Sequence, residues 1–454
     1  MTRTSLASVK HAHVAIDPAD LAGMCEDVVD ACMRAGADQA EVHARSGSGL
    51  KVEVRMDQVE TIARRQDRSL RIVVFRNGCK GVADTGDFAP ESIAVAMDKA
   101  RSIANRVEPD LHGGLADPGL YAREFTDLDV WHPWDVDTEH AIGIARDIEQ
   151  VGRAVDARIR TSNGAAVDTR RVLSASANSL GFIGAHRATS HEMSASFVAG
   201  DTAGMQRDGW HDVACAVGDL MEPGALGRMA ASRAAARLGA RALPTQRCPV
   251  MFVPNLAAGL FRDFVSAADG AAIARGASFL GDKLDAPVLP GFVDLVERPK
   301  LLRGLGSANY DAEGVALSDS PLVTQGVLRR YVLDSRSARR LHMRTTGNSG
   351  GISNLVVSGR NEDVQSMLRT MGNGFLVTEL MGHGVSLVTG SYSRGASGFW
   401  VENGEVAYPV EGVTIASNLV DMYAGIVAVG SDVDRRSRVL TGSVLVGEMT
   451  VAGS

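Results

Sequence analysis

The first predicted helix lies near the N-terminus, where apolar residues recur every three or four positions. Asp17 can cap its start, Pro18 suits a first turn, and Gly36 is a natural stop. The apolar positions are Leu21, Met24, Cys25, Val28, Val29, Cys32 and Met33. This spacing places them on one face of a helix that packs against a core.

Strand periodicity follows this helix. Apolar and polar residues alternate at 41–45, 50–56 and 70–75, and the last run ends before the turn Asn77-Gly78. Such alternation predicts an antiparallel sheet with one face in water. A second amphipathic helix is predicted at about 91–105, so residues 1–110 form an N-terminal α+β unit.

Residues 111–240 are predicted to be a middle unit of the same N-terminal lobe. The predicted elements are an aperiodic connector at 107–135, a helix at 138–155, paired strands at 158–199 and an alanine-rich helix at 224–240. Within the strands, Ser162-Asn-Gly164 and Asn178-Ser-Leu-Gly181 are interpreted as turns.

From residue 241 onward the chain changes to short strands between glycine turns. A buried strand at 248–253 precedes a helix at 254–268, and Asn403-Gly404 is a strong type I′ hairpin signal. Residues 241–454 are therefore predicted to be a β-rich domain. The predicted fold class is α+β, with an N-terminal α/β lobe of antiparallel strands and helices and a C-terminal β-rich domain.

Composition and charge narrow the classes of function. The 454 residues include 47 basic and 54 acidic ones, a net charge of −7, and only 5% are aromatic. This balance argues against a nucleic-acid-binding surface. No apolar run approaches the roughly 18 residues of a membrane helix, and the first residues lack a signal-peptide pattern, so we expect a cytoplasmic protein without a membrane partner. Five scattered cysteines are interpreted as small buried residues.

The sequence gives little support for the familiar catalytic motifs. A zinc peptidase needs two histidines one helical turn apart beside a glutamate, but the one His-Glu pair, His191-Glu192, lies in a strand pattern and is interpreted as a surface pair. Gly347-Asn-Ser-Gly-Gly351 is interpreted as a loop rather than a nucleophile elbow. Asp311 and Glu313 could form a carboxylate pair, although capping of a turn is the favoured interpretation.

The glycine-rich block from Gly382 to Gly398 is the remaining candidate site. Of 49 glycines in the chain, 18 lie after residue 344, and five lie in this block. Such a loop can bring main chain close to an extended peptide. The candidate peptide-binding residues are Gly382, His383, Gly384, Tyr392, Ser393 and Arg394. A tight β-connection without a ligand remains an equal alternative.

The C-terminal half also carries a family resemblance. The matching stretches are Ser278-Phe-Leu-Gly-Asp-Lys-Leu284, Tyr310-Asp-Ala-Glu-Gly314, Gly326-Val-Leu328, Tyr331-Val-Leu-Asp-Ser335, Thr345-Thr-Gly-Asn348, Thr378-Glu-Leu-Met-Gly-His-Gly384, Gly390 to Glu405, and Gly442 to Gly453. In order and spacing they resemble the PmbA/TldE branch of the TldD/PmbA family, called the modulator of DNA gyrase family. The resemblance spans about 245–453 and is less specific before that.

The resemblance implies a cytosolic zinc peptidase made of a TldD-like and a TldE-like subunit, which acts on unfolded or modified peptides. The TldD-like subunit holds zinc through an H-E-x-x-x-H helix and a C-terminal cysteine. The corresponding positions here are Phe261, Arg262 and Ser266, and the last cysteine is Cys248. This chain is therefore expected to be the non-catalytic subunit, with no catalytic or metal-binding residue of its own and zinc on its partner.

Two alternatives of other classes remain. The chain could be a self-sufficient peptidase whose site combines His383 with Glu379 or Asp311. It could also be a homodimeric peptide-binding scaffold without a peptidase partner.

Overall fold

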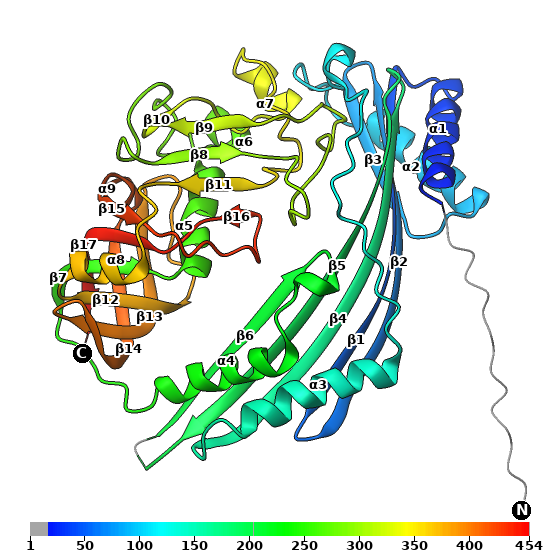
Figure 1. The fold of residues 1–454 in the computed structure, drawn as a ribbon. Coiled ribbons are helices and arrows are strands. Elements are labelled where there is room, and N and C mark those ends of the chain that lie inside the picture. The colour runs from blue at the N-terminus through cyan, green and yellow to red at the C-terminus, as the bar shows by residue number, and fades with distance from the viewer. Residues whose placement is uncertain (1–16, 203, 454) are drawn as a thin grey trace, which may run out of the picture.

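A computed structural model describes residues 17–202 and 204–453, and its N-terminal lobe is built on one six-stranded antiparallel sheet in the order β3-β2-β1-β4-β5-β6 (Figure 1). The strands are β1 (Gln39–Arg55), β2 (Gln58–Arg76), β3 (Cys79–Thr85), β4 (Ile159–Asn178), β5 (Ile183–Gly200) and β6 (Met205–Ala214). The two predicted N-terminal units share this sheet, because β1 pairs with β4 from Glu41–Asn178 to Val54–Ala165.

The strands are longer than their periodicity predicted. Strand β1 has 17 residues and continues through Ser46-Gly-Ser-Gly49, where the prediction placed a break. It stays extended because it pairs on both sides, with Ser46 opposite Arg68 and Leu173. The predicted turn at Ser162–Gly164 is wrong, since β4 passes through it with a bulge. The predicted turn at Asn178–Gly181 is confirmed.

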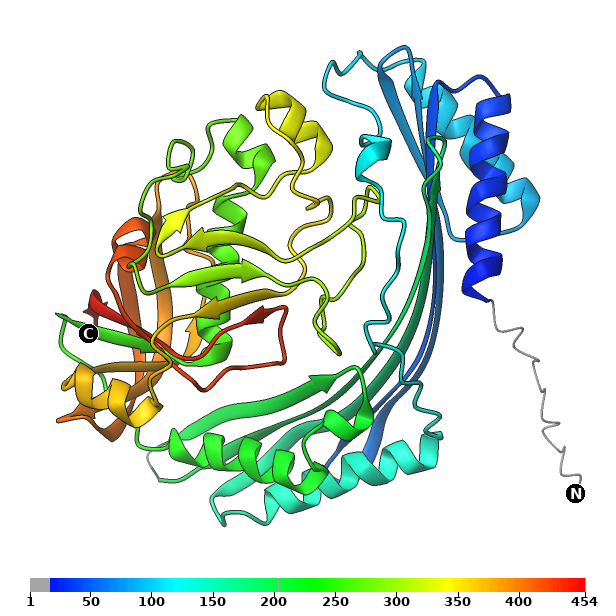
Figure 2. The same cartoon turned by 45° about the horizontal axis from the view of Figure 1, so that its top comes forward.

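Four helices cover one face of this sheet. Helices α1 (Pro18–Arg34) and α2 (Pro90–Ala104) lie at one end, and α3 (Thr138–Arg153) and α4 (Pro223–Ala236) lie at the other. The even-numbered positions of β1 contact both pairs: Ala40, Val42 and Ala44 face the first, and Leu50, Val52 and Val54 face the second. Side chains alternate along a strand, so both pairs cover the same face, which is convex in Figures 1 and 2.

The opposite, concave face of the sheet holds the connector and the C-terminal lobe (Figure 2). Leu115 of the connector packs on Val73 and Phe75. Further along, Phe182 contacts Tyr310 of the C-terminal lobe with ring centroids 5.0 Å apart. The connector also contacts the C-terminal lobe directly, because Tyr121 forms a β-bridge with Val315 and the Ala122 amide donates to the Gly314 carbonyl.

The C-terminal lobe contains two sheets. One runs β14-β13-β12-β7-β17-β15, and an added β14–β17 pairing closes five of its strands into a barrel. Its strands are β7 (Gln246–Phe252), β12 (Gly374–Met381), β13 (Ser391–Glu402), β14 (Glu405–Asn418), β15 (Ile426–Val429) and β17 (Val444–Ala452). The second sheet runs β10-β9-β8-β11-β16, with β8 (Asp294–Glu297), β9 (Ser320–Thr324), β10 (Val327–Leu328), β11 (Leu355–Ser358) and β16 (Val439–Leu440).

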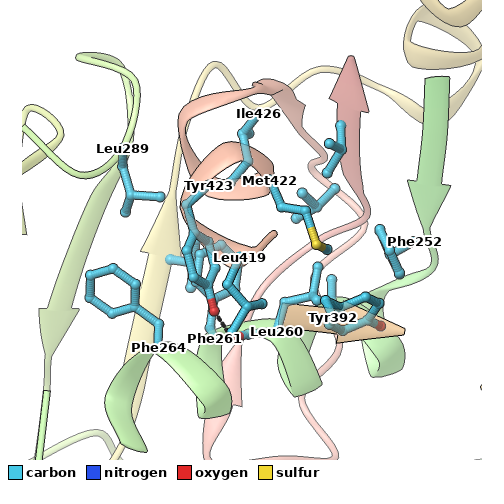
Figure 3. Packing of buried hydrophobic residues seen from close by; sticks show 14 of the residues in the cluster. Phe252, Leu260, Phe261, Phe264, Leu289, Tyr392, Leu419, Met422, Tyr423 and Ile426 are labelled. Carbon is cyan, nitrogen blue, oxygen red and sulfur yellow. Dashed lines mark hydrogen bonds between the residues drawn. The ribbon is translucent and has the colours of Figure 1, made fainter. Parts of the chain in front are cut away.

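Helix α5 (Pro254–Ala267) lies in the main core of this lobe (Figure 3). Its residues Phe261 and Phe264 are fully buried, and Phe264 makes an edge contact with Tyr423 at 5.2 Å between ring centroids. The Tyr423 hydroxyl donates to the Leu260 carbonyl oxygen at 2.7 Å. The shorter helices are α6 (Gly270–Ala274), α7 (Ser335–Arg340), α8 (Val364–Met371) and α9 (Leu419–Ala424).

The main sequence predictions about the fold are confirmed. The class is α+β, and the helices predicted at 91–105, 138–155, 224–240 and 254–268 are present. Asn403 and Gly404 have positive φ of 53° and 80°, as a type I′ turn requires. All five cysteines are buried and free. No helix in the described part of the chain is long and apolar enough to cross a membrane.

Candidate functional site

The six predicted peptide-binding residues do not share one surface. Gly382 and His383 are exposed directly after β12. Tyr392 is only 2% exposed and belongs to the core of the C-terminal lobe. The Tyr392 ring faces inward on β13 beside α5 (Figure 3), so it does not lie on the surface with Gly382 and His383.

Three glycines of the block are explained by close packing within the chain. A Cβ on Gly384 would lie 1.9 Å from the Ser393 carbonyl oxygen, and one on Gly398 would lie 1.9 Å from that of Leu376. A Cβ on Gly390 would lie 2.5 Å from Asn418 Oδ1. The Ser393 amide donates to the Gly384 carbonyl at 2.7 Å. At these positions the alternative interpretation, a tight β-connection, accounts for the glycines.

Gly382 differs from those three glycines. Its φ is +77°, and a Cβ there would meet nothing within 4 Å. The turn conformation alone requires glycine here. Gly382, His383, Gly384 and Ser393 are the exposed members of the predicted set, and Arg394 is partly exposed.

Helix α5 presents a different arrangement. Phe261 is fully buried in the core, whereas Arg262 and Ser266 are exposed and Asp263 is partly buried. Burial raises the pKa of Asp263, and the positive charges of Arg394 and Arg262 partly oppose that shift. The helix predicted at 254–268 thus buries Phe261 and also carries Asp263, a carboxylate between the buried Phe261 and Phe264.

Three polar side chains meet where α5 packs on β13. Tyr392 and Arg394 are two residues apart on the strand and therefore lie on the same face, and both are near enough to Asp263 for their charges to affect one another's pKa. The Tyr392 hydroxyl and the Arg394 Nε are buried without a hydrogen-bond partner among the described residues. Burial raises the pKa of Tyr392 to about 12, and Arg394 is near enough to oppose this, although no hydrogen bond of good geometry joins them.

Glu379 joins the two lobes. Its carboxylate lies 2.5 Å from Nη2 of Arg237, at the C-terminal end of α4. Arg237 also lies 3.9 Å from Asp208 and donates to the Arg207 carbonyl. Glu379 thus has a structural partner, which weakens the alternative in which it activates His383.

Asp311 and Glu313 form turn caps, as the favoured interpretation predicted. Asp311 accepts backbone N–H groups of Glu313, Val315 and Ser349 at 2.9–3.0 Å. Glu313 accepts the Ser335 amide at 3.0 Å. Burial raises the pKa of Asp311 to about 7 despite these three donors.

Two further motif interpretations can be compared with the structure. His191 lies on β5 but is fully buried, so the predicted surface pair is wrong for the histidine. Its Nδ1 lies 2.9 Å from Thr169 Oγ1, and its Nε2 lies 2.9 Å from the His132 carbonyl. Gly347–Gly351 is a loop as predicted, and Asn348 within it donates to buried Glu297 at 3.0 Å.

Comparison with known proteins identifies the family. Family models for the PmbA/TldA metallopeptidase match domain 1 at residues 40–104, the central domain at 131–238 and the C-terminal domain at 245–453. This chain belongs to that family, and its predicted resemblance to the PmbA/TldE branch is confirmed.

Individual relatives agree with this family. Metalloprotease PmbA of Escherichia coli O157:H7 is 39% identical, and the alignment covers 92% of this chain and 93% of that protein. A PmbA homologue of Haemophilus influenzae is 38% identical over 94% of each. A Bacteroides thetaiotaomicron structure described as a modulator of DNA gyrase has a TM-score of 0.89 at 23% identity, covering 95% of this chain and 98% of that one. TldE of Thermococcus kodakarensis has a TM-score of 0.83 at 18% identity over 95% and 100%.

A metallopeptidase family implies a zinc site, and the residues of α5 do not fit one. Phe261 offers no ligand atom and is enclosed by the core, Arg262 is cationic, and Ser266 is a poor zinc ligand. Across residues 17–202 and 204–453, no group of three or more His, Cys, Asp or Glu side chains could hold a metal ion.

Proposed function

We propose that this chain is the non-catalytic, TldE-like subunit of a mixed metallopeptidase. The main support is the composition of α5, where Phe261, Arg262 and Ser266 stand at the positions that the family resemblance assigns to zinc ligands and base. Restoring zinc binding would require histidines in place of the fully buried Phe261 and of Ser266, together with a third ligand, and hydrolysis would also need a base in place of Arg262. Hydrolysis is then the task of a TldD-like partner that carries the zinc.

The proposed role of this subunit is to complete the substrate chamber and to hold peptide. Exposed Gly382 and His383 are proposed to approach the peptide main chain, because glycine permits close contact and main-chain pairing ignores side-chain identity. Such pairing suits a wide range of unfolded or modified peptides. We place the complex in the cytoplasm, and the net charge of −7 gives no support to a nucleic-acid partner.

The test measures zinc content and peptide hydrolysis for the purified chain, for its TldD-like partner and for their mixture. We expect zinc below one equivalent in this chain alone, no turnover by it, and turnover together with a mixed complex in the mixture. Stoichiometric zinc and hydrolysis by the lone chain would falsify the proposal.

The same preparations address the two alternatives. A His383→Ala variant is expected to leave the lone chain as inactive as before, whereas loss of a measurable lone-chain turnover would support the self-sufficient peptidase. Size analysis with and without the partner tests the scaffold alternative, because only the mixed enzyme requires a complex of two different chains.

A further inference from the structure

Helices α1 and α2 cover one end of the convex face of the large sheet (Figure 1), and a pocket lies between them above β2. Its volume is about 130 Å³. Three buried residues form its floor, Cys32 of α1, Val74 of β2 and Ala104 of α2. Met97 of α2 forms a partly buried wall. The pocket therefore has an apolar interior that adjoins the core of the N-terminal lobe.

Short side chains keep this space open. Helix α2 packs closely on β3, where a Cβ on Gly81 would lie 1.9 Å from the Ala100 carbonyl oxygen. Many of the lining residues have a methyl side chain or none, namely Ala35, Gly36, Ala37, Ala94 and Ala104. Such residues leave the gap between α2 and the end of α1 unfilled, although protein interiors are normally packed closely.

Two side chains that contain sulfur indicate what the pocket can hold. Burial raises the pKa of the Cys32 thiol in the floor to about 11, so it is uncharged at neutral pH. The other is the thioether of Met97. Sulfur atoms make favourable contacts with aromatic rings. An engineered apolar cavity of about 150 Å³ binds benzene, so the volume here suits a ligand with one six-membered ring.

The mouth of the pocket carries one positive charge without a counter-charge. Arg101 pairs with Asp98, with 2.8 Å between Nη2 and Oδ1. Arg76 makes one long hydrogen bond, 3.4 Å from its Nη1 to Asn105 Oδ1, and forms no ion pair with another described residue. It stands two residues from Val74 on β2, so it lies on the face that α1 and α2 cover. A ligand with one negative charge would complement it.

We propose that this pocket binds a small aromatic carboxylic acid. The ring lies against Cys32 and Met97, and the carboxylate lies at the mouth and accepts from the Arg76 guanidinium. The end of α1 does not prevent this, because the amides of residues 35–37 already cap its last carbonyl groups and reduce their repulsion of an anion. The pocket and the C-terminal lobe lie on opposite faces of the sheet (Figure 2), so this inference goes beyond the proposed subunit role and does not depend on it.

The test compares 4-fluorobenzoate with the neutral 4-fluorobenzyl alcohol, two probes of similar size. Each is titrated with the full chain at neutral pH while its fluorine NMR signal is followed. We expect the acid to bind with a dissociation constant of about 1 mM or lower. It should bind at least about fivefold tighter than the alcohol, which cannot form a charge-assisted pair with Arg76.

A change of charge at the mouth tests the contact with the carboxylate. Arg76→Gln removes the charge and keeps a polar side chain, so the preference for the acid should fall to within about twofold. Arg34→Gln is the matched control, because this exposed arginine at the end of α1 does not line the pocket, and it should leave the preference unchanged.

A larger side chain at the mouth tests where the ring binds. Ala94 is exposed and lines the pocket, so Ala94→Leu should fill the space and weaken both probes by at least about tenfold. Leucine favours a helix almost as strongly as alanine, so α2 should remain folded. Val95→Leu is the control, because Val95 is 69% exposed on the same helix and does not line the pocket. It should change the affinity for neither probe.

Three results would overturn the inference. The first is that neither probe binds below about 10 mM, which would mean that the pocket does not take a small ligand of this kind. The second is equal affinity for the acid and the alcohol. The third is binding of the acid that survives Ala94→Leu, because the ligand would then lie elsewhere. None of these results affects the test of zinc content and hydrolysis, so the two proposals can fail separately.

Discussion

Two features of the C-terminal lobe differ in how far their polar groups are paired. They are the glycine backbone of the block Gly382–Gly398 and the side chains of Tyr392 and Arg394 in the same block, which face the middle of α5. In the block, Gly384 and Gly398 allow close backbone contacts, and the Ser393 amide has a partner within the block. In α5, two buried phenylalanines flank Asp263, whose pKa is affected by Arg394 of β13, and the Arg394 Nε and Tyr392 hydroxyl of that strand are buried without a partner among the described residues. An unusual glycine content distinguishes the first region in the sequence, whereas unpaired hydrogen-bond donors distinguish the second in the structure.

This difference separates two causes of an unusual sequence. Glycine is required wherever backbones approach too closely for a Cβ, whether or not a ligand binds. Unpaired buried donors have no such structural explanation, because they reduce stability unless something else satisfies them. The second kind of signal becomes visible only once the chain is folded.

The largest expected effect tests whether α5 is a core helix. Phe261→Ala should lower the free energy of unfolding by about 4 kcal/mol, because it leaves a cavity at a fully buried position. The adjacent exposed Arg262→Ala should change it by less than about 0.5 kcal/mol. Urea unfolding of both variants measures this contrast, and a similar cost for the two would mean that α5 is not packed as described.

The next effect tests the close packing of the glycine block. Gly398→Ala should destabilise the protein by about 3 kcal/mol, since its Cβ would lie 1.9 Å from the Leu376 carbonyl oxygen and the strands would have to shift. Gly143→Ala in α3 is the control, because a Cβ there meets nothing within 4 Å, and it should stabilise by about 0.5–1 kcal/mol. If urea unfolding gives Gly398→Ala no cost, the strand contact is looser than the structure indicates.

A smaller effect compares two buried tyrosines that differ in their hydroxyl partners. Tyr423→Phe should lower the free energy of unfolding by about 1 kcal/mol, because its hydroxyl donates to the Leu260 carbonyl at 2.7 Å. Tyr392→Phe should cost nothing or stabilise slightly, because its hydroxyl has no partner in the described structure. Thermal unfolding of the two variants measures this difference. An equal loss of stability in both would mean that the Tyr392 hydroxyl also has a hydrogen-bond partner.

Periodicity predicted the helices well but not the length of the strands or the candidate site. The apolar spacing of α1 and α5 reflects local geometry, so it is visible in sequence. Strand β1 continues through Ser46–Gly49 because β2 and β4 pair with it, and β4 lies more than a hundred residues away. The neighbourhood of Asp263 and Arg394 likewise joins α5 to β13 across a similar separation. A charged residue within an apolar helix face was the available signal, and by itself it does not identify its partner.

The smallest effect concerns pH and the carboxylate of Asp263. Burial raises its folded-state pKa above the ordinary 3.8, so the folded protein holds this proton more tightly than the unfolded chain does. The resulting stabilisation is complete below pH 3.8 and is lost as pH rises through the higher folded-state value. Asp263→Asn removes this dependence, so the thermal midpoint of the variant minus that of the wild type should increase above about pH 4 and then level off. In an Arg394→Gln background, which lacks an opposing positive charge, this increase in the difference between thermal midpoints should extend to higher pH. A difference that stays constant from pH 4 to pH 8 would show that Asp263 is solvated like an ordinary surface carboxylate.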